Sequence, residues 1–232
     1  FDPWLVNFFS KGRRMLGIFF GCTTMIEESL RKALETFLER IGVEHEKLGV
    51  DQCCGIPLIL SGSVREAKEH AERVVRTIES RNVDRLVTSC PHCYVAFSRE
   101  YRELFGIDLP FQTLHFSQFA RELIKDGKIK PSKRVALTLT YHDPCYLGRK
   151  GNDIYDEPRQ VLLAIPGIQL KEMGFNRRQT TCCGAGGLLR AVLPKLSVEI
   201  AKEKIESQVV PIGAEGIVSS CPFCYLNLRE GA

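Results

Sequence analysis

Ten cysteines carry most of the chemistry that this sequence of 232 residues can offer. They form two sets of five, and each set contains two adjacent cysteines followed by glycine and, further on, a Cys-Pro-X-Cys motif. The first set is Cys22, Cys53, Cys54, Cys90 and Cys93, and the second set is Cys145, Cys182, Cys183, Cys221 and Cys224. Because the whole pattern recurs, the chain is predicted to consist of two duplicated subdomains.

Each set holds one thiol more than a common metal site needs. A structural zinc ion takes four ligands, and a cubane four-iron cluster usually takes four cysteines. Soft thiolates select iron–sulfur clusters, zinc or copper(I), and two adjacent cysteines can contact different metal ions of one cluster. The pattern favours a polynuclear iron–sulfur cluster in each set. The alternatives are zinc in one site, a redox-active thiol pair and ordinary buried cysteines.

The composition indicates a protein with a hydrophobic core. Hydrophobic residues make up 44% of the chain, so disulfide cross-links are not needed for stability. The net charge is +4 with basic and acidic residues intermixed, which gives no reason to expect a nucleic-acid partner. Neither a membrane-spanning apolar run nor a secretory signal is found. A cytoplasmic location is therefore expected, with any membrane association through a partner subunit.

Short apolar segments are expected to form the strands that position the cysteines. The predicted strands are 14–20, 85–89, 135–141 and 216–220, and the predicted helices include 27–40, 64–78 and 194–209. This alternation predicts an α/β fold with two small, mainly parallel sheets that are flanked by helices and related by pseudo-two-fold symmetry. One cysteine follows each strand, at the edge where open α/β sheets gather ligands.

The same pattern predicts the domain boundaries. We expect an N-terminal extension at 1–12, a first subdomain at 13–108, a connector at 109–133 and a second subdomain at 134–232. The aromatic segment 1–9 is expected to pack on a partner or on another domain.

Glycines follow both pairs of adjacent cysteines. Gly55 and Gly184 are expected to adopt positive φ and to let the backbone approach a bound cluster closely. Gly186 and Gly187 extend the second motif, where their amides would either hydrogen-bond to cluster sulfides or form a simple turn.

Other polar residues near the cysteines have two interpretations each. His142 is the candidate catalytic residue, as a proton donor, with a buried structural histidine as the alternative. His92 lies inside the first Cys-Pro-X-Cys motif, but the repeat does not require it because Phe223 takes its place in the second. Arg149 and Lys150 would attract an anionic substrate or belong to a solvated loop.

The repeat resembles the cysteine-rich CCG domain of heterodisulfide reductase catalytic subunits of the B and D types. The resemblance covers almost the whole chain, and its most specific segments are YHDPCYLGRKGNDIYDEPRQVLLAIPG and TCCGAGG. It implies an iron–sulfur oxidoreductase subunit in which each complete set of five cysteines holds a noncubane four-iron cluster for disulfide and thiol redox chemistry.

The resemblance also implies partners. These are other redox subunits, either ferredoxin-like iron–sulfur proteins or flavoproteins, and a small disulfide or thiol substrate. The domain is shared with iron–sulfur subunits of lactate and glycolate oxidases and of glycerol-3-phosphate dehydrogenase. An electron-transfer subunit of a flavin-dependent dehydrogenase therefore remains an alternative, as does a zinc-binding structural protein.

Overall fold

The computed structural model describes residues 15–232, so the expected N-terminal extension and its aromatic segment lie outside the described residues. The described chain forms two compact units. The first contains the residues up to Thr88 together with Ala96–Leu114, and the second contains Ser89–Val95 and His115–Ala232. The predicted domain boundaries and the pseudo-two-fold relation stay predictions.

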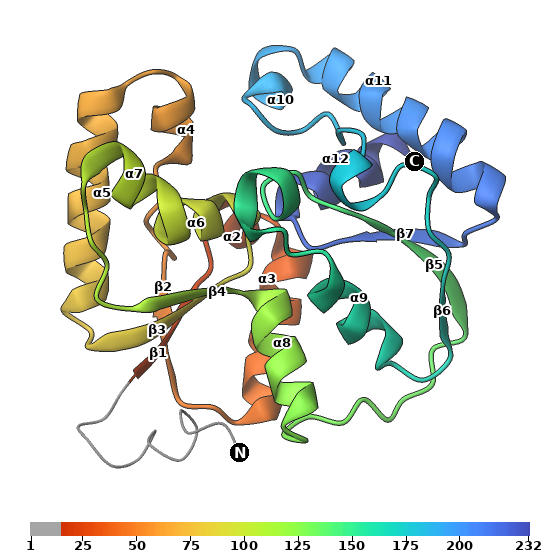
Figure 1. Ribbon diagram of the computed structural model, residues 1–232, viewed down its shortest axis with the longest axis horizontal. Coiled ribbons are helices and arrows are strands. Elements are labelled where there is room, and N and C mark those ends of the chain that lie inside the picture. The colour runs from red at the N-terminus through yellow and green to blue at the C-terminus, as the bar shows by residue number, and fades with distance from the viewer. Residues whose placement is uncertain (1–14) are drawn as a thin grey trace. The chain divides into compact units, whose positions relative to one another are not determined.

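The first unit is built on a sheet with the strand order β2-β1-β3-β4 (Figure 1). Its elements are β1 (Met15–Phe19), α2 (Cys22–Ile26), α3 (Glu28–Ile41), β2 (His45–Leu48), α4 (Ile56–Leu60), α5 (Val64–Glu79), β3 (Val83–Thr88), the π-helical turn η2 (Ala96–Glu100), α7 (Tyr101–Phe105) and β4 (Gln112–His115), whose last residue belongs to the second unit.

The central strand of this sheet is buried because both of its neighbours run parallel to it. β1 pairs with β2 and with β3 in parallel register, and Ile18 and Phe19 are almost fully buried. A continuous apolar run is typical of a strand covered on both faces. The helix α5 contributes a buried stripe that includes Ala71 and Val74, as its apolar spacing predicts.

The second unit has a sheet with the strand order β6-β5-β7, in which both pairs are parallel. Its elements are α6 (Pro91–Val95), α8 (Phe116–Lys125), β5 (Leu137–His142), the π-helical turn η3 (Gly148–Asn152), α9 (Asp156–Leu163), β6 (Ile168–Leu170), η4 (Arg177–Gln179), α10 (Leu189–Val192), α11 (Pro194–Lys204), η5 (Ile205–Val209), η6 (Val210–Ile212), β7 (Gly216–Ser219) and α12 (Pro222–Gly231). In the view of Figure 1, α11 and α9 lie on opposite sides of these strands.

The two sheets confirm the predicted α/β class with parallel strands. In both units the first strand lies between the second and the third, so the order β2-β1-β3 recurs as β6-β5-β7. The strands β2, β4 and β6 were not expected from the sequence. They are three or four residues long, and a polar segment such as His45–Leu48 carries no apolar run to mark it.

Candidate metal centre

The ends of neighbouring strands position two cysteines of the second set. β5 ends at His142 and β7 ends at Ser219, and these two residues lie opposite each other in the parallel register. Cys145 follows the first strand and Cys221 follows the second. The strand-end position expected from the sequence is therefore present, and it brings residues that are far apart in the chain to one edge of the sheet.

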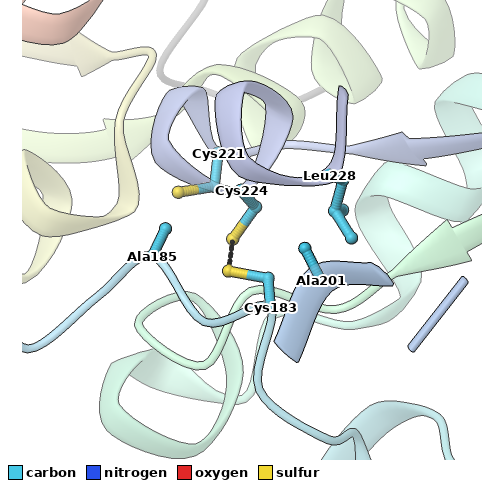
Figure 2. Packing of buried hydrophobic residues seen from close by; sticks show 6 residues of the cluster. All are labelled: Cys183, Ala185, Ala201, Cys221, Cys224 and Leu228. Carbon is cyan, nitrogen blue, oxygen red and sulfur yellow. Dashed lines mark hydrogen bonds between the residues drawn. The ribbon is translucent and has the colours of Figure 1, made fainter. Parts of the chain in front are cut away.

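Three cysteines of the second set lie in one buried group (Figure 2). Cys183, Cys221 and Cys224 are each 4% exposed, and the Sγ atoms of Cys183 and Cys224 are 3.1 Å apart. All ten cysteines of the chain are free thiols. A buried group of free thiols offers the soft ligands that iron and zinc take.

His142 joins this group from the end of β5. One of its ring nitrogens and the Sγ atoms of Cys183 and Cys224 all lie within 4.8 Å of one another. The imidazole is 1% exposed, and its Nδ1 has no hydrogen-bond partner among the described residues. A buried polar atom without a partner is costly, so this nitrogen is suited to meet a ligand or a proton.

The two adjacent cysteines of each set differ in exposure, and they differ in the same sense in both units. Cys54 and Cys183 are buried, whereas Cys53 is partly exposed and Cys182 is exposed. In each unit the amide of the following glycine donates a hydrogen bond to the outer thiol, Gly55 to Cys53 at 3.4 Å and Gly184 to Cys182 at 3.3 Å. The outer and inner thiols are thus presented in different directions.

Both of these glycines adopt positive φ, as expected, with 76° at Gly55 and 87° at Gly184. A side chain at Gly184 would also collide with the backbone carbonyl of Ser197. Only glycine therefore allows this turn next to the second pair of cysteines. Gly186 and Gly187 lie in a turn just before α10, and their role toward a cluster stays a prediction.

Hydrogen bonds within the second set favour thiolates at its buried positions. The thiols of Cys182 and Cys224 lower the pKa of Cys183 far below its usual value. The pKa of Cys221 is lowered by Cys224 and by His92. Because the thiolate is the form that binds metals, this arrangement prepares Cys183 and Cys221 as ligands.

The first unit holds three cysteines of the first set. The Sγ atoms of Cys22 and Cys53 are 3.8 Å apart. The backbone of the adjacent pair is held by side chains, because Tyr101 donates to the carbonyl of Cys54 at 2.7 Å and His70 lies 2.7 Å from the carbonyl of Cys53. Cys90 and Cys93 belong to the second unit. The gathering of all five into one site stays a prediction.

His92 lies among residues of the second set. Its ring stacks on Tyr146 with the centroids 4.0 Å apart and meets the edge of Phe223, and its Nδ1 lies 4.0 Å from the Sγ of Cys90. Burial alone would lower the pKa of the imidazole, but the thiols of Cys221 and Cys90 outweigh burial and raise it well above its usual value. His92 therefore contacts cysteines of both sets, which the sequence did not predict.

Sequence reasoning also missed Asn227, which fixes the backbone of Cys183. The Asn227 amide is fully buried and donates to the carbonyl of Cys183 at 2.6 Å and to that of Ser197 at 2.8 Å. The hydroxyl of Ser197 donates to the Asn227 side chain and to the carbonyl of Gly184. No motif marks these residues, because their partners are distant in the sequence.

A buried ion pair supports the loop that carries Cys145. Arg159 donates to both carboxylate oxygens of Asp143 at 2.6 and 2.9 Å and to both oxygens of Glu172 at 2.6 and 2.8 Å. Asp143 also accepts a hydrogen bond from the amide of Arg177 at 2.7 Å. This bidentate geometry fixes the residue two positions before Cys145.

Arg149 has a structural contact of its own. Its guanidinium donates to the carbonyls of Arg178 at 3.0 Å and Thr180 at 2.6 Å, and it thereby holds the segment that leads to the adjacent cysteines. Lys150 lies over the ring of Tyr146, with Nζ 4.7 Å from its centroid. Neither side chain is a freely solvated loop residue.

The fold and the cysteines define a duplicated α/β protein with thiol-rich sites, and the comparison with protein families agrees. The family model of the cysteine-rich domain, CCG, matches residues 16–98 and 139–229. The chain belongs to this cysteine-rich domain family, as the repeat in the sequence predicted.

Several curated proteins are similar to this chain. The D-type subunit of dihydromethanophenazine:CoB–CoM heterodisulfide reductase from Methanosarcina acetivorans is 37% identical over 92% of this chain and 53% of its own length. The B-type subunit of fumarate reductase (CoM/CoB) from Methanothermobacter marburgensis is 32% identical over 93% of this chain and 42% of its own length. A probable iron–sulfur-binding oxidoreductase of Bacillus subtilis, FadF, is 38% identical over 71% of this chain and 23% of its own length.

The chain thus spans about half the length of the curated D-type heterodisulfide reductase subunits that it matches. Within residues 15–232, no helix combines the length and the apolar character that crossing a membrane requires.

Proposed function

We propose that the chain is the cysteine-rich part of an iron–sulfur oxidoreductase of the heterodisulfide reductase type. Each set of five cysteines holds a noncubane four-iron cluster in this proposal, and the clusters serve the redox chemistry of disulfides and thiols. The observation that supports it most is the buried group of Cys183, Cys221 and Cys224 at the ends of neighbouring strands. The names of the relatives, an iron–sulfur oxidoreductase and heterodisulfide reductase subunits among them, point the same way.

The donor set of the second unit fits a cluster. It combines buried free thiols, an adjacent pair whose members differ in exposure, and a glycine amide directed at the outer thiol. Cys145 completes the set, and burial raises the pKa of its thiol, with Cys183 and Cys221 adding to the effect. A single zinc ion would use four of these ligands and leave one thiol unexplained. For this reason we favour a cluster over zinc.

The proposed reaction consumes two electrons and two protons for each disulfide bond that is cleaved, and it releases two thiols. A bound iron–sulfur cluster supplies single electrons and an iron at which a thiolate sulfur can be held. His142 is the proposed proton donor, because its buried imidazole lies beside Cys183 and Cys224 and its Nδ1 has no partner among the described residues. The cysteines and the surrounding hydrogen bonds hold the ligands in place.

The electrons must come from another redox protein. We propose a ferredoxin-like iron–sulfur protein or a flavoprotein as the donor, in a complex that lies in the cytoplasm or reaches the membrane through a partner. Support comes from the relatives, which are named as subunits and are about twice as long as the matched region.

The proposal is tested on protein purified without oxygen. We expect about eight irons per chain, as two four-iron clusters require, together with inorganic sulfide. Adding a small thiol to the oxidised protein should change its electron paramagnetic resonance spectrum, because the thiolate sulfur binds at a cluster. The S-methylated form of the same thiol, which has no thiolate, is the control and should leave the spectrum unchanged.

Other outcomes separate the alternatives. Zinc without iron or sulfide would contradict the proposal and favour a zinc protein. Clusters that are reduced by a flavoprotein, but whose spectrum no thiol or disulfide changes, would favour an electron-transfer role in a flavin-dependent dehydrogenase.

A further inference from the structure

Lys204 is a buried cation next to the second set of cysteines. It is the last residue of α11 and is only 2% exposed. Its ammonium group donates to the hydroxyl of Thr181 at 2.8 Å and to the side chain of Gln208 at 3.3 Å, and the Gln208 amide donates to the same hydroxyl at 2.9 Å. Thr181 directly precedes the adjacent cysteines, so the positive charge is anchored beside them.

The charge of Lys204 has no carboxylate partner in the described part of the chain. The buried lysine and arginine side chains among residues 15–232 are Lys204 and Arg159. Arg159 is neutralised by Asp143 and Glu172, whereas no acidic oxygen of the described residues lies within ion-pairing distance of the Lys204 nitrogen. A buried charge without a counter-charge is strongly unfavourable, so an anion is expected close to Lys204.

The groups near Lys204 that can supply negative charge are thiols. Burial lowers the pKa of the Lys204 ammonium, and thiolates at Cys183, Cys224 and Cys182 act against this effect. These three thiols belong to the proposed ligand set of the second unit. A thiolate-ligated iron–sulfur cluster is an anion, and it would occupy the place where the ammonium lacks a partner.

The first unit has no equivalent charge. Among its described residues, no lysine or arginine side chain is buried. A nearby positive charge stabilises the reduced, more negative form of a cluster and therefore raises its reduction potential. The two sites should thus differ in potential although their cysteine motifs are the same.

We propose that Lys204 is the counter-charge of an anionic cluster at the second set of cysteines and makes that site the better electron acceptor of the two. The inference rests on the proposed function, since it requires that the second set holds a cluster. In the protein, electrons that reach the cluster of the first set would then move on to the cluster of the second.

The test compares two variants that each remove one positive charge from α11. Lys204→Gln keeps an amide that can donate to Thr181 but has no charge. Lys202→Gln removes a lysine whose side chain is 55% exposed, and it is the matched control. The measurement is a redox titration of the purified protein without oxygen, followed by electron paramagnetic resonance. The signal of the second cluster is identified as the one that disappears in Cys183→Ser.

In Lys204→Gln we expect the second cluster to become harder to reduce. Its ratio of reduced to oxidised form at a fixed potential should fall at least about tenfold, which is about 59 mV for a one-electron couple. The first cluster should keep its potential, the iron content should stay that of the wild type, and Lys202→Gln should change neither cluster. Lys204→Met should have the same effect as Lys204→Gln if charge is the cause.

Three results would overturn the inference: an unchanged second cluster in Lys204→Gln, an equal shift of both clusters, or a shift in Lys204→Met alone. The last result would assign the effect to hydrogen bonding. A wild-type protein that binds no iron or sulfide would instead overturn the proposed function. The two failures are therefore distinguishable.

Discussion

Serine in place of Cys183 should lower the iron content from about eight to about four per chain, because one of two four-iron clusters is lost. The Cys183 thiol is 4% exposed and lies 3.1 Å from the thiol of Cys224, at the centre of the buried group. A serine hydroxyl is a hard ligand with a much higher pKa than a thiol, so it does not replace a thiolate on iron. The backbone at this position stays held by Asn227.

The matched variant is Cys54→Ser, which changes the buried member of the adjacent pair in the first unit. It should also remove about four irons, but it should abolish the other paramagnetic signal. We expect both variants to lose the disulfide reductase activity of the complex, since the proposed reaction uses both clusters. Iron and sulfide quantitation, together with the spectrum of each variant, makes the measurement. A Cys183→Ser protein that keeps all of its iron, or loses all of it, would contradict the assignment of two separate ligand sets.

Replacing Arg159 by methionine should lower the free energy of unfolding by about 3–5 kcal/mol, because it leaves the carboxylate of Asp143 buried without its partner. The side chains of Arg159 and Asp143 are 5% and 2% exposed, so water cannot replace the lost ion pair. The contact with Glu172 adds less, since that side chain is 36% exposed. Denaturant unfolding of the anaerobic protein measures the change.

The same substitution should weaken the second site. Asp143 lies two residues before Cys145, and Arg159 together with the amide of Arg177 fixes its carboxylate. The control is Arg178→Met, which removes a 77% exposed side chain paired to Asp153 at 3.6 Å and should change stability by no more than about 0.5 kcal/mol.

A double variant shows whether the buried charge is the cause. Adding Asp143→Asn to Arg159→Met removes the unpaired carboxylate, so the double variant should be more stable than Arg159→Met alone. If it is less stable by the full effect of both changes, the loss would come from packing and not from charge.

The fold class could be predicted from the sequence because its signals are local. Apolar runs such as 135–141 mark buried parallel strands, and the glycines after the adjacent cysteines mark turns with positive φ. The short strands β2 and β6 carry no such run, since they are made by pairing with a neighbour along only a few residues. Their existence depends on the sheet, which a local pattern does not encode.

The sequence by itself determined the duplication, the ten cysteines and their place after strands, because a repeated spacing of chemically distinctive residues is visible without coordinates. Only the tertiary structure decided which member of each adjacent pair is buried and that His92 lies among residues of the second set. It also decided that a lysine from α11 brings an unpaired charge to Thr181. Burial and long-range contacts arise when distant segments pack together, so residues such as Lys204 and Asn227 carry no signal until the chain is folded.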